Sequence, residues 1–413
     1  MVKQKGEKTL KKNKICLVIL IVFYFVPSVL AADDVLSSIK EGKISGYLRN
    51  YFFSRDFKNG TTDRQDWAIG GKLHYETAPF KGVNMGFSFY TAQDFGLNDD
   101  DKDVYGLLAD SGRGGREGVS VLGEAYIQAQ WKDTIFKLGR QEIDNPWLNA
   151  VDIRFTPNTF QGFLVENKSF SGFTFNAGHI TDVKARTESK FISLSKVLGA
   201  AESKPMTFAG IILDTDKNFK LQLWNYHAHD VWNDIYLRAD YNHKLTKDIT
   251  FLMSGGGLYR TDTGDELIGS IDSYMYTLKM GLNLYGFTLT SAYTQIGDQT
   301  LDLTLGYELL VSAQVEEAEQ ADEQAWMWRL SYDFSEIGIN DLSAAITYYT
   351  FDRPNSGSNA GSDTQEIDFD VKYKFSGKLD GWSIRARYAI LDREGVSSSE
   401  DLNDLRIYLS YTF

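Results

Sequence analysis

The sequence has little of several features that define common protein classes. Its 413 residues include one cysteine, Cys16, and six prolines. A single thiol excludes a disulfide framework and a metal site built from several thiolates. No apolar run reaches the ~18–20 residues that a membrane-spanning helix needs, so a helical membrane protein is excluded. The formal charge of −13 argues against nucleic-acid binding, because no net positive field attracts phosphates.

The composition that remains is that of a folded chain. Hydrophobic residues make up 43% and aromatic residues 14%, which excludes a disordered protein. The mean hydropathy of −0.30 resembles that of a soluble protein. A transmembrane β-barrel has the same average, because only alternate residues face lipid.

The N-terminus predicts export. Six lysines lie within residues 1–14, an unbroken apolar run covers 15–26, and small residues lead to Ala31. A basic region, a short apolar core and a small-residue site predict a cleaved signal peptide, residues 1–31. Cleavage removes Cys16 and leaves residues 32–413 as a single domain. An uncleaved membrane anchor is the alternative, which the short run disfavours.

The rest of the chain shows the alternation of β-strands. Near the C-terminus, Ile367, Phe369 and Val371 alternate with charged residues such as Asp368 and Asp370. Most such segments are about ten residues long, the length that a tilted strand needs to cross a membrane. Eighteen segments begin near residues 44, 66, 83, 119, 134, 160, 172, 206, 218, 234, 249, 271, 286, 325, 341, 365, 381 and 403.

The connections between these segments alternate in length. Short ones cover 79–82, 132–133, 214–217 and 245–248, and long ones cover 93–118, 182–204 and 297–324. Outer-membrane barrels have short periplasmic turns and long extracellular loops. We therefore predict an all-β transmembrane antiparallel barrel of about 18 strands, with its charged face lining water. A secreted soluble β-sandwich is the alternative, but the alternation runs to the last residue without a linker.

Several stretches resemble the OprD-type outer-membrane porins, and the resemblance extends over essentially the whole mature chain. They are Ser54-Arg55-Asp56-Phe57, the run from Trp67 to Thr77, Tyr90-Thr91-Ala92-Gln93-Asp94, Val121-Leu122-Gly123-Glu124-Ala125-Tyr126, Leu138-Gly139-Arg140-Gln141, Asp152-Ile153-Arg154, Pro157-Asn158-Thr159-Phe160 and Asn403-Asp404-Leu405-Arg406-Ile407. The resemblance implies an 18-strand barrel in the outer membrane of a Gram-negative bacterium. It also implies passive diffusion of small hydrophilic solutes, often carboxylates such as amino acids or organic acids.

The resemblance further implies a pore narrowed by an inward-folded loop, here near 142–159, and a ladder of basic residues along the wall. Strand parity turns most of the candidate pore residues inward: Arg49, Lys72, Arg238, Arg329, Arg385, Arg387, Arg406, Glu124, Asp368 and Asp370. Arg140 and Arg154 are added on the resemblance. The parity of Arg140 is ambiguous, because Phe136 and Leu138 share its face. The alternative for each residue is that its charge only solvates the lumen.

Signals for an enzyme are poor. His227 and His229 share a strand face beside Asp230, but no second ligand cluster accompanies them, and we predict no metal site, cofactor or catalytic residue. The Gly-x-Ser-x-Gly elbow and the phosphate-binding Gly-x-x-x-x-Gly-Lys-Ser/Thr loop are both missing. The rival hypotheses are an outer-membrane hydrolase in a plugged barrel and a surface-binding barrel without a conducting pore.

The expected partners follow from location. They are small solutes, outer-membrane lipid, and lipopolysaccharide bridged to acidic loops by divalent cations. The alternative for these acidic runs is that they are only solvated loops. The terminal Phe413 resembles the signal that barrel-assembly machinery reads. The sequence leaves open whether the barrel is a monomer or a trimer.

Overall fold

The computed structural model describes residues 34–413, apart from 59, 100, 111–114, 151–152, 216–217, 304, 307–309 and 396–400. The predicted signal peptide, residues 1–31, lies outside the described residues, as does Asp152 of the predicted inward loop.

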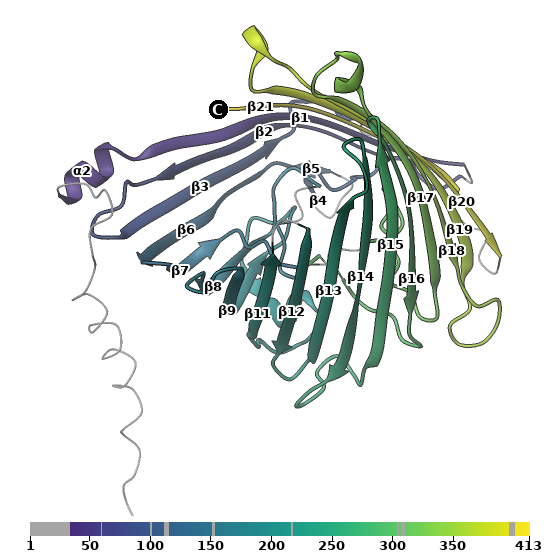
Figure 1. Ribbon diagram of the computed structural model, residues 1–413, viewed down its shortest axis with the longest axis horizontal. Coiled ribbons are helices and arrows are strands. Elements are labelled where there is room, and N and C mark those ends of the chain that lie inside the picture. The colour runs from purple at the N-terminus through teal and green to yellow at the C-terminus, as the bar shows by residue number, and fades with distance from the viewer. Residues whose placement is uncertain are drawn as a thin grey trace, which may run out of the picture.

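The strands form a closed antiparallel barrel (Figure 1). Within the described residues, eighteen long strands are joined edge to edge. The first strand, β1 (Lys43–Phe57), pairs with β2 (Arg64–Glu76) and with the last strand, β21 (Leu402–Thr412). This last pairing closes the ring, so no strand edge presents unpaired backbone groups to lipid. The predicted fold class is confirmed.

The remaining long strands follow in chain order, and each pairs with the next. They are β3 (Val83–Gln93), β6 (Val119–Trp131), β7 (Thr134–Gln141), β8 (Thr159–Asn167), β9 (Phe173–Lys184), β11 (Met206–Thr215), β12 (Phe219–Ala228), β13 (Trp232–Lys244), β14 (Ile249–Asp262), β15 (Asp272–Leu284), β16 (Phe287–Ile296), β17 (Gln324–Asp333), β18 (Leu342–Asp352), β19 (Ser362–Lys374) and β20 (Trp382–Gly395). Each predicted segment begins within three residues of the observed strand.

Minor elements lie in the connections. β4 (Ala109–Asp110) pairs with β5 (Arg116–Glu117) in the loop after β3, and β10 (Ile192–Ser193) and α3 (Leu194–Val197) follow β9. The helix α2 (Val35–Lys40) precedes β1, and the 3-10 turns η2 (Phe334–Ile337) and η3 (Gly377–Leu379) join strands. None of the helices among the described residues has the length and apolarity required to span a membrane.

The two faces of each strand differ as the alternation predicts. On β15, Tyr274, Tyr276 and Leu278 are exposed on the outer face, whereas Ser273 and Thr277 are buried toward the lumen. The short turns gather at one end of the barrel, where β1 begins and β21 ends, and the long loops gather at the other. We call these the short-turn end and the long-loop end.

A local irregularity turns one acidic side chain inward. The pairing of β3 with β6 shifts by one residue between Ser88 and Phe89, so that Gly123 on β6 is left without a direct partner. Such a bulge reverses the alternation beyond it. Val121 and Glu124 therefore both face the lumen, although they are three residues apart.

Long loops cover much of the inner wall. Trp147 of the loop after β7 packs edge-on against the lumen-facing Trp232, with ring centroids 4.8 Å apart. Leu301 and Leu303 of the loop after β16 join the same buried cluster, which also contains Tyr226. Part of the lumen wall is therefore apolar, contrary to the expectation of a charged inner face, because loop side chains shield it from water.

Two further clusters attach loops to other parts of the wall. Tyr105 and Leu107 of the loop after β3 pack with Phe53 of β1. Val311 of the loop after β16 packs with Phe351 of β18. Figure 1 shows β4 and β5 lying within the ring of strands. These contacts place loop segments beside the charged part of the lumen.

Candidate functional site

Four of the predicted basic residues, Arg385, Arg387, Arg406 and Arg49, lie on the consecutive strands β20, β21 and β1, beside β19. Arg385 of β20 lies directly opposite Lys372 of β19, and Arg387 lies between Asp370 of β19 and Arg406 of β21. Directly opposed residues in antiparallel strands have Cβ atoms ~5 Å apart and share a face. The register therefore places basic residues close together on the lumen side of these strands. We call Lys372, Arg385 and Arg387, together with Arg49 of β1, the basic strip.

Arg49 extends this strip onto β1. It lies opposite Ser410 of β21 and Gly70 of β2. Its guanidinium carbon is 3.8 Å from the ring centroid of Tyr47 and 5.5 Å from that of Tyr51. Aromatic faces attract a guanidinium and restrict its side chain, so the charge of Arg49 is held close to the wall.

Acidic residues on β19 partly neutralise the strip. Two of the three guanidinium nitrogens of Arg385 donate to Asp370, with Nε 2.9 Å from Oδ1 and Nη2 2.6 Å from Oδ2. Arg387 Nη2 is 4.0 Å from Asp368 Oδ2. The Arg385 side chain is 41% exposed, so it remains open to the water-filled lumen.

Arg406 has a different role from its neighbours, because it is only 2% exposed. Its Nε donates to Asp404 at 2.7 Å, and its Nη2 donates to the Gln314 carbonyl at 2.8 Å and the Tyr105 hydroxyl at 3.0 Å. Arg55 adds a second cation to Asp404 at 3.0 Å. Arg406 thus joins two loops to the wall and leaves little of its charge facing solute.

The loop after β16 is also held by acidic side chains. The Asp368 carboxylate accepts the Gln314 N–H at 2.9 Å. Glu366 accepts the N–H groups of Val315 at 2.9 Å and Glu316 at 3.0 Å. Three successive backbone donors are therefore satisfied by β19, which determines how this loop lies across the basic strip.

A second charged group surrounds Lys72 on the adjoining wall. Lys72 Nζ is 2.9 Å from both Glu124 Oε2 and Glu142 Oε1. The Tyr90 hydroxyl donates to Glu124 at 3.0 Å and also contacts Glu142. Ser88 donates to Glu124 as well. This group connects β2, β3 and β6 to the start of the loop after β7.

Arg154 of the same loop lies against aromatic rings. Its guanidinium carbon is 5.6 Å from the ring centroids of both Phe53 and Tyr105. Its Nη1 is buried and has no hydrogen-bond partner among the described residues. Burial, followed by the charge of Arg406, lowers the pKa of Arg154 to about 10. A buried guanidinium with an unused donor is suited to an anionic group.

The other two predicted lumen cations lie on other strands. Arg238 of β13 is held by Asp240 of its own strand, with Nη2 2.9 Å from Oδ1, and it lies apart from the strip. Arg329 of β17 donates from Nη1 to the Thr347 hydroxyl at 3.1 Å, and Thr347 lies directly opposite Asp368, so Arg329 lies beside the acidic side of the strip. The predicted set therefore does not form one cluster.

Arg140 lies on the outer face and corrects the expectation from the resemblance. It is directly opposite Ala125 and Gln161, and it shares its face with Leu138, which is 60% exposed. Its Nε is 3.3 Å from Gln161 Oε1, and its guanidinium carbon is 4.4 Å from the Phe191 ring centroid. Arg140 lies two residues from Leu138 on the same strand, and alternate residues of a strand share a face, so it faces outward with its apolar neighbours.

One buried ion pair was not predicted from the sequence. Arg260 Nη2 is 2.8 Å from Asp234 Oδ2, and both side chains are 1% exposed or less. Arg260 also lies over the Trp232 ring at 4.2 Å. Strand parity could have placed Arg260 on the lumen side, because it shares the inner face of β14 with the buried Leu258.

The histidines singled out as a weak metal motif lie near the long-loop end. His227 and His229 have ring centroids 4.6 Å apart. Among the residues that the structure describes, no group of three or more His, Cys, Asp or Glu side chains is arranged to hold a metal ion.

Comparisons with known proteins identify outer-membrane porins as the relatives of this chain. A family model described as outer membrane porin, OprD family, matches residues 38–413. Porin D of Pseudomonas aeruginosa is 26% identical over 406 residues, covering 90% of this chain and 91% of that protein.

Solved structures show the same fold. OccK9 (OpdG) of Pseudomonas aeruginosa has a TM-score of 0.82 at 22% identity, covering 91% of this chain and 99% of that one. A BenF-like porin from Pseudomonas fluorescens has a TM-score of 0.82 at 19% identity, with the same coverage. OpdK of Pseudomonas aeruginosa, solved with vanillate, has a TM-score of 0.80 at 22% identity and again the same coverage.

Proposed function

The chain belongs to the OprD family of outer-membrane porins, and we propose that it favours carboxylate-bearing solutes and guides them along the basic strip of β19–β1. As a family member it is a channel for small solutes in the outer membrane of a Gram-negative bacterium. The observation that carries the proposal is the register that places Lys372 opposite Arg385, with Arg387 two residues along β20 and Arg49 on the same lumen face of β1, beyond β21.

The proposed mechanism is a series of weak exchanges. Arginine suits a carboxylate because its planar fork donates two parallel hydrogen bonds. Arg385 is bound in this way to Asp370, so a solute carboxylate competes with Asp370 rather than meeting an unpaired cation. Competition keeps each binding step weak, and weak binding at several sites lets a solute leave as well as enter.

Acidic side chains beside the strip suit a second solute group. Asp368 and Asp370 adjoin Arg387 and Arg385, so a solute with both a carboxylate and an amine finds partners of each sign within one patch. The structure of OpdK was solved with vanillate, an aromatic carboxylate, and that relative supports the assignment of solute class.

We also propose that the loop at 142–158 narrows the pore. Trp147 fixes it to the wall beside Trp232, and Lys72 holds Glu142 at its beginning. Arg154 then presents a buried guanidinium on the side of the loop toward Phe53. A loop attached at several points keeps one shape, which a selective constriction requires.

Three finer proposals concern assembly and surroundings. Phe413, which is 47% exposed and whose backbone exchanges hydrogen bonds with Gly46, presents the signal to barrel-assembly machinery. The exposed acidic loop after β3, which contains Asp99 and Asp101, contacts lipopolysaccharide through divalent cations, whereas Glu316 and Glu323 of the loop after β16 are paired with arginines. The barrel acts as a monomer or a trimer without an enzymatic step. Removal of Phe413 tests the first of these, since it should reduce the heat-modifiable folded form in the outer membrane.

Single-channel conductance in planar bilayers tests the proposed function. Wild-type protein should give discrete steps, and added benzoate or glutamate should reduce ion current by occupying the strip. The double variant R385Q/R387Q should keep its conductance steps and lose most of the inhibition by carboxylates.

The matched control is R238Q, which removes a lumen arginine on β13, away from the strip. It should retain the inhibition. Equal inhibition in R385Q/R387Q and wild type would contradict the carboxylate role. A folded barrel that never conducts would direct attention to the hydrolase and surface-binding alternatives.

A further inference from the structure

A row of polar side chains crosses the outer face near the long-loop end. His179 of β9 lies opposite Thr207 of β11, Thr207 lies opposite His227 of β12, and His227 lies opposite Asn233 of β13. These residues share the outer face with exposed apolar residues two or four positions away on the same strands, such as Ile235 and Leu223. Polar side chains on a lipid-facing wall mark the level at which hydrocarbon gives way to headgroups.

Two imidazoles of this region converge on one hydroxyl, and a third lies beside them. His179 Nδ1 is 2.9 Å from Thr207 Oγ1, and His229 Nε2 is 3.0 Å from the same oxygen. The His179 and His229 ring centroids are 6.2 Å apart, and the His227 ring is 4.6 Å from that of His229. We call His179, His227 and His229 the histidine cluster. It gathers several ring N–H donors at a surface that faces the membrane.

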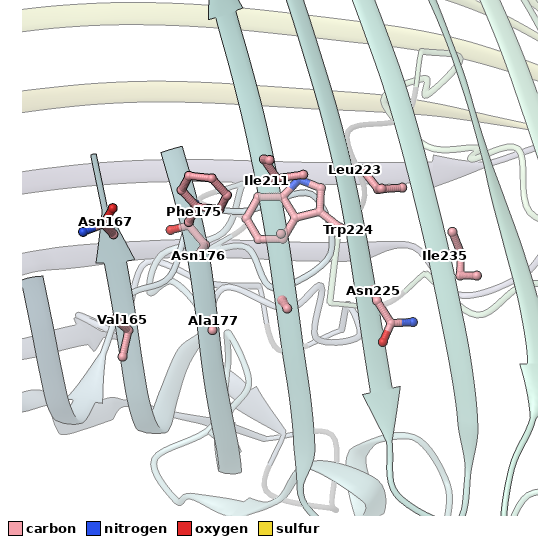
Figure 2. A pocket seen from close by; sticks show the side chains of 12 residues that line it. Val165, Asn167, Phe175, Asn176, Ala177, Ile211, Leu223, Trp224, Asn225 and Ile235 are labelled. Atoms are coloured by element: carbon pink, nitrogen blue, oxygen red, sulfur yellow. The ribbon is translucent and has the colours of Figure 1, made fainter. Parts of the chain in front are cut away.

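An apolar groove lies next to the cluster, toward the middle of the wall, and Figure 2 shows the side chains that line it. Its border nearest the cluster is the next outward-facing row of the register, in which Ala177, Ala209, Asn225 and Ile235 lie side by side. The groove has a volume of about 690 Å³. Further lining residues are Val165, Phe175, Ile211 and Leu223. Small side chains at 177 and 209 leave the depression between larger neighbours.

We propose that this surface binds one phosphorylated acyl glycolipid of the outer leaflet, with an acyl chain in the groove and a phosphate at the histidine cluster. The family places the barrel in the outer membrane, so lipids of this kind surround its outer face. Phosphate oxygens accept hydrogen bonds from imidazole N–H groups in either protonation state. The apolar groove adds burial of acyl methylene groups.

The arrangement favours a lipid over a neighbouring barrel. A barrel wall is convex, and a second convex wall cannot fill a narrow depression, whereas an acyl chain can. The nearby Lys204 is bound to Asp230 at 2.6 Å, so these two charges offset each other. Asp182 of β9 is held by Gln161 Nε2 at 3.1 Å. The histidines therefore remain as hydrogen-bond donors at the border of the groove toward the long-loop end.

Binding of fluorescent bis-phosphorylated lipid A to the purified, detergent-solubilised porin tests the proposal. The triple variant H179A/H227A/H229A should bind at least ~10-fold more weakly, the change that corresponds to about 1.4 kcal/mol. A209F fills the groove without touching the cluster and should also weaken binding. The matched control is H243A, which removes an exposed outward-facing histidine at the short-turn end of β13.

Each variant is first checked for the heat-modifiable folded form and for unchanged single-channel conductance. Unchanged affinity in the triple variant would overturn the proposal. Equal binding of dephosphorylated lipid A would overturn it too, because the phosphate would then contribute nothing. Disulfide cross-linking between A209C barrels in membranes would show that a second copy covers the groove, and would also reject the lipid as its occupant.

Discussion

Arg387 of β20 lies directly opposite Arg406 of β21, so two like charges face each other across adjacent strands. Like charges in this position repel and destabilise a sheet unless other groups compensate. Arg406 is compensated by Asp404 at 2.7 Å and by two loop oxygens, whereas Arg387 has Asp368 at 4.0 Å. The two arginines therefore have different roles. Arg406 holds the loops in place, and Arg387 contributes its charge to the basic strip.

Arg406→Met should destabilise the protein and free two loops. Replacing the cation leaves the buried Asp404 short of a partner, and breaking a buried ion pair costs about 3 kcal/mol or more. Urea unfolding of the detergent-solubilised barrel measures the loss. The control is Arg385→Gln, whose half-exposed pair contributes about 1 kcal/mol or less. Equal stability losses in the two variants would argue against the anchoring role of Arg406.

Glu124→Gln should shift ion selectivity toward anions. Lys72 is balanced by Glu124 and Glu142 at equal distances of 2.9 Å, and removing one carboxylate exposes more of the lysine charge to the lumen. Reversal potentials in a salt gradient report the change. Glu76→Gln removes a carboxylate that is 39% exposed, and the shift there should be smaller because water screens it. A larger shift in the Glu76 variant would contradict this account.

Trp147→Ala should loosen the loop at 142–158 and raise conductance. Trp147 is fully buried against Trp232 and Tyr226, and truncating a buried tryptophan costs about 3–5 kcal/mol of packing. The open-channel current should increase and become noisier. Trp131→Ala provides the comparison, since Trp131 is 51% exposed on the outer face. An unaltered current in the Trp147 variant would reject the proposed constriction.

The loop after β16 should lose stability as pH rises. Burial, followed by the charges of Glu317 and Asp302, raises the pKa of Glu319 to about 7. The folded loop therefore holds this proton more tightly than the unfolded chain, whose pKa is 4.5, and stability falls between pH 4.5 and about 7. Hydrogen exchange of residues 310–323 should be faster at pH 8 than at pH 5, after correction for intrinsic rates.

Glu319→Gln should reduce that pH difference, because the amide carries no charge at either pH. Glu336→Gln, on the short-turn side in η2, is the control and should leave the difference unchanged. A pH dependence that persists in full in the Glu319 variant would assign it to another group.

The barrel itself could be predicted from local pattern. A strand repeats every two residues, so Ile367, Phe369 and Val371 determine which face of β19 meets lipid wherever that strand lies in the sheet. Segment lengths and alternating connections then predict the number of strands and their direction. Arg140 shows what happens when the resemblance is preferred to this signal: its parity was ambiguous, the resemblance placed it in the pore, and the structure places it on the outer face with Leu138.

The lumen could not be predicted in the same way. Loops carry no periodicity, and the partners of Arg406 come from Tyr105 and Gln314, which are far away in the chain. Similarly, Arg260 and Asp234 look like ordinary lumen charges until the loop after β16 buries them.

The sequence by itself thus determined the barrel, its strand positions and the face of most side chains, because period-two burial is a local property. Only the tertiary structure decided which charges pair, which are buried beneath loops and which still face solute. Those outcomes depend on contacts between distant segments, and no local pattern encodes them.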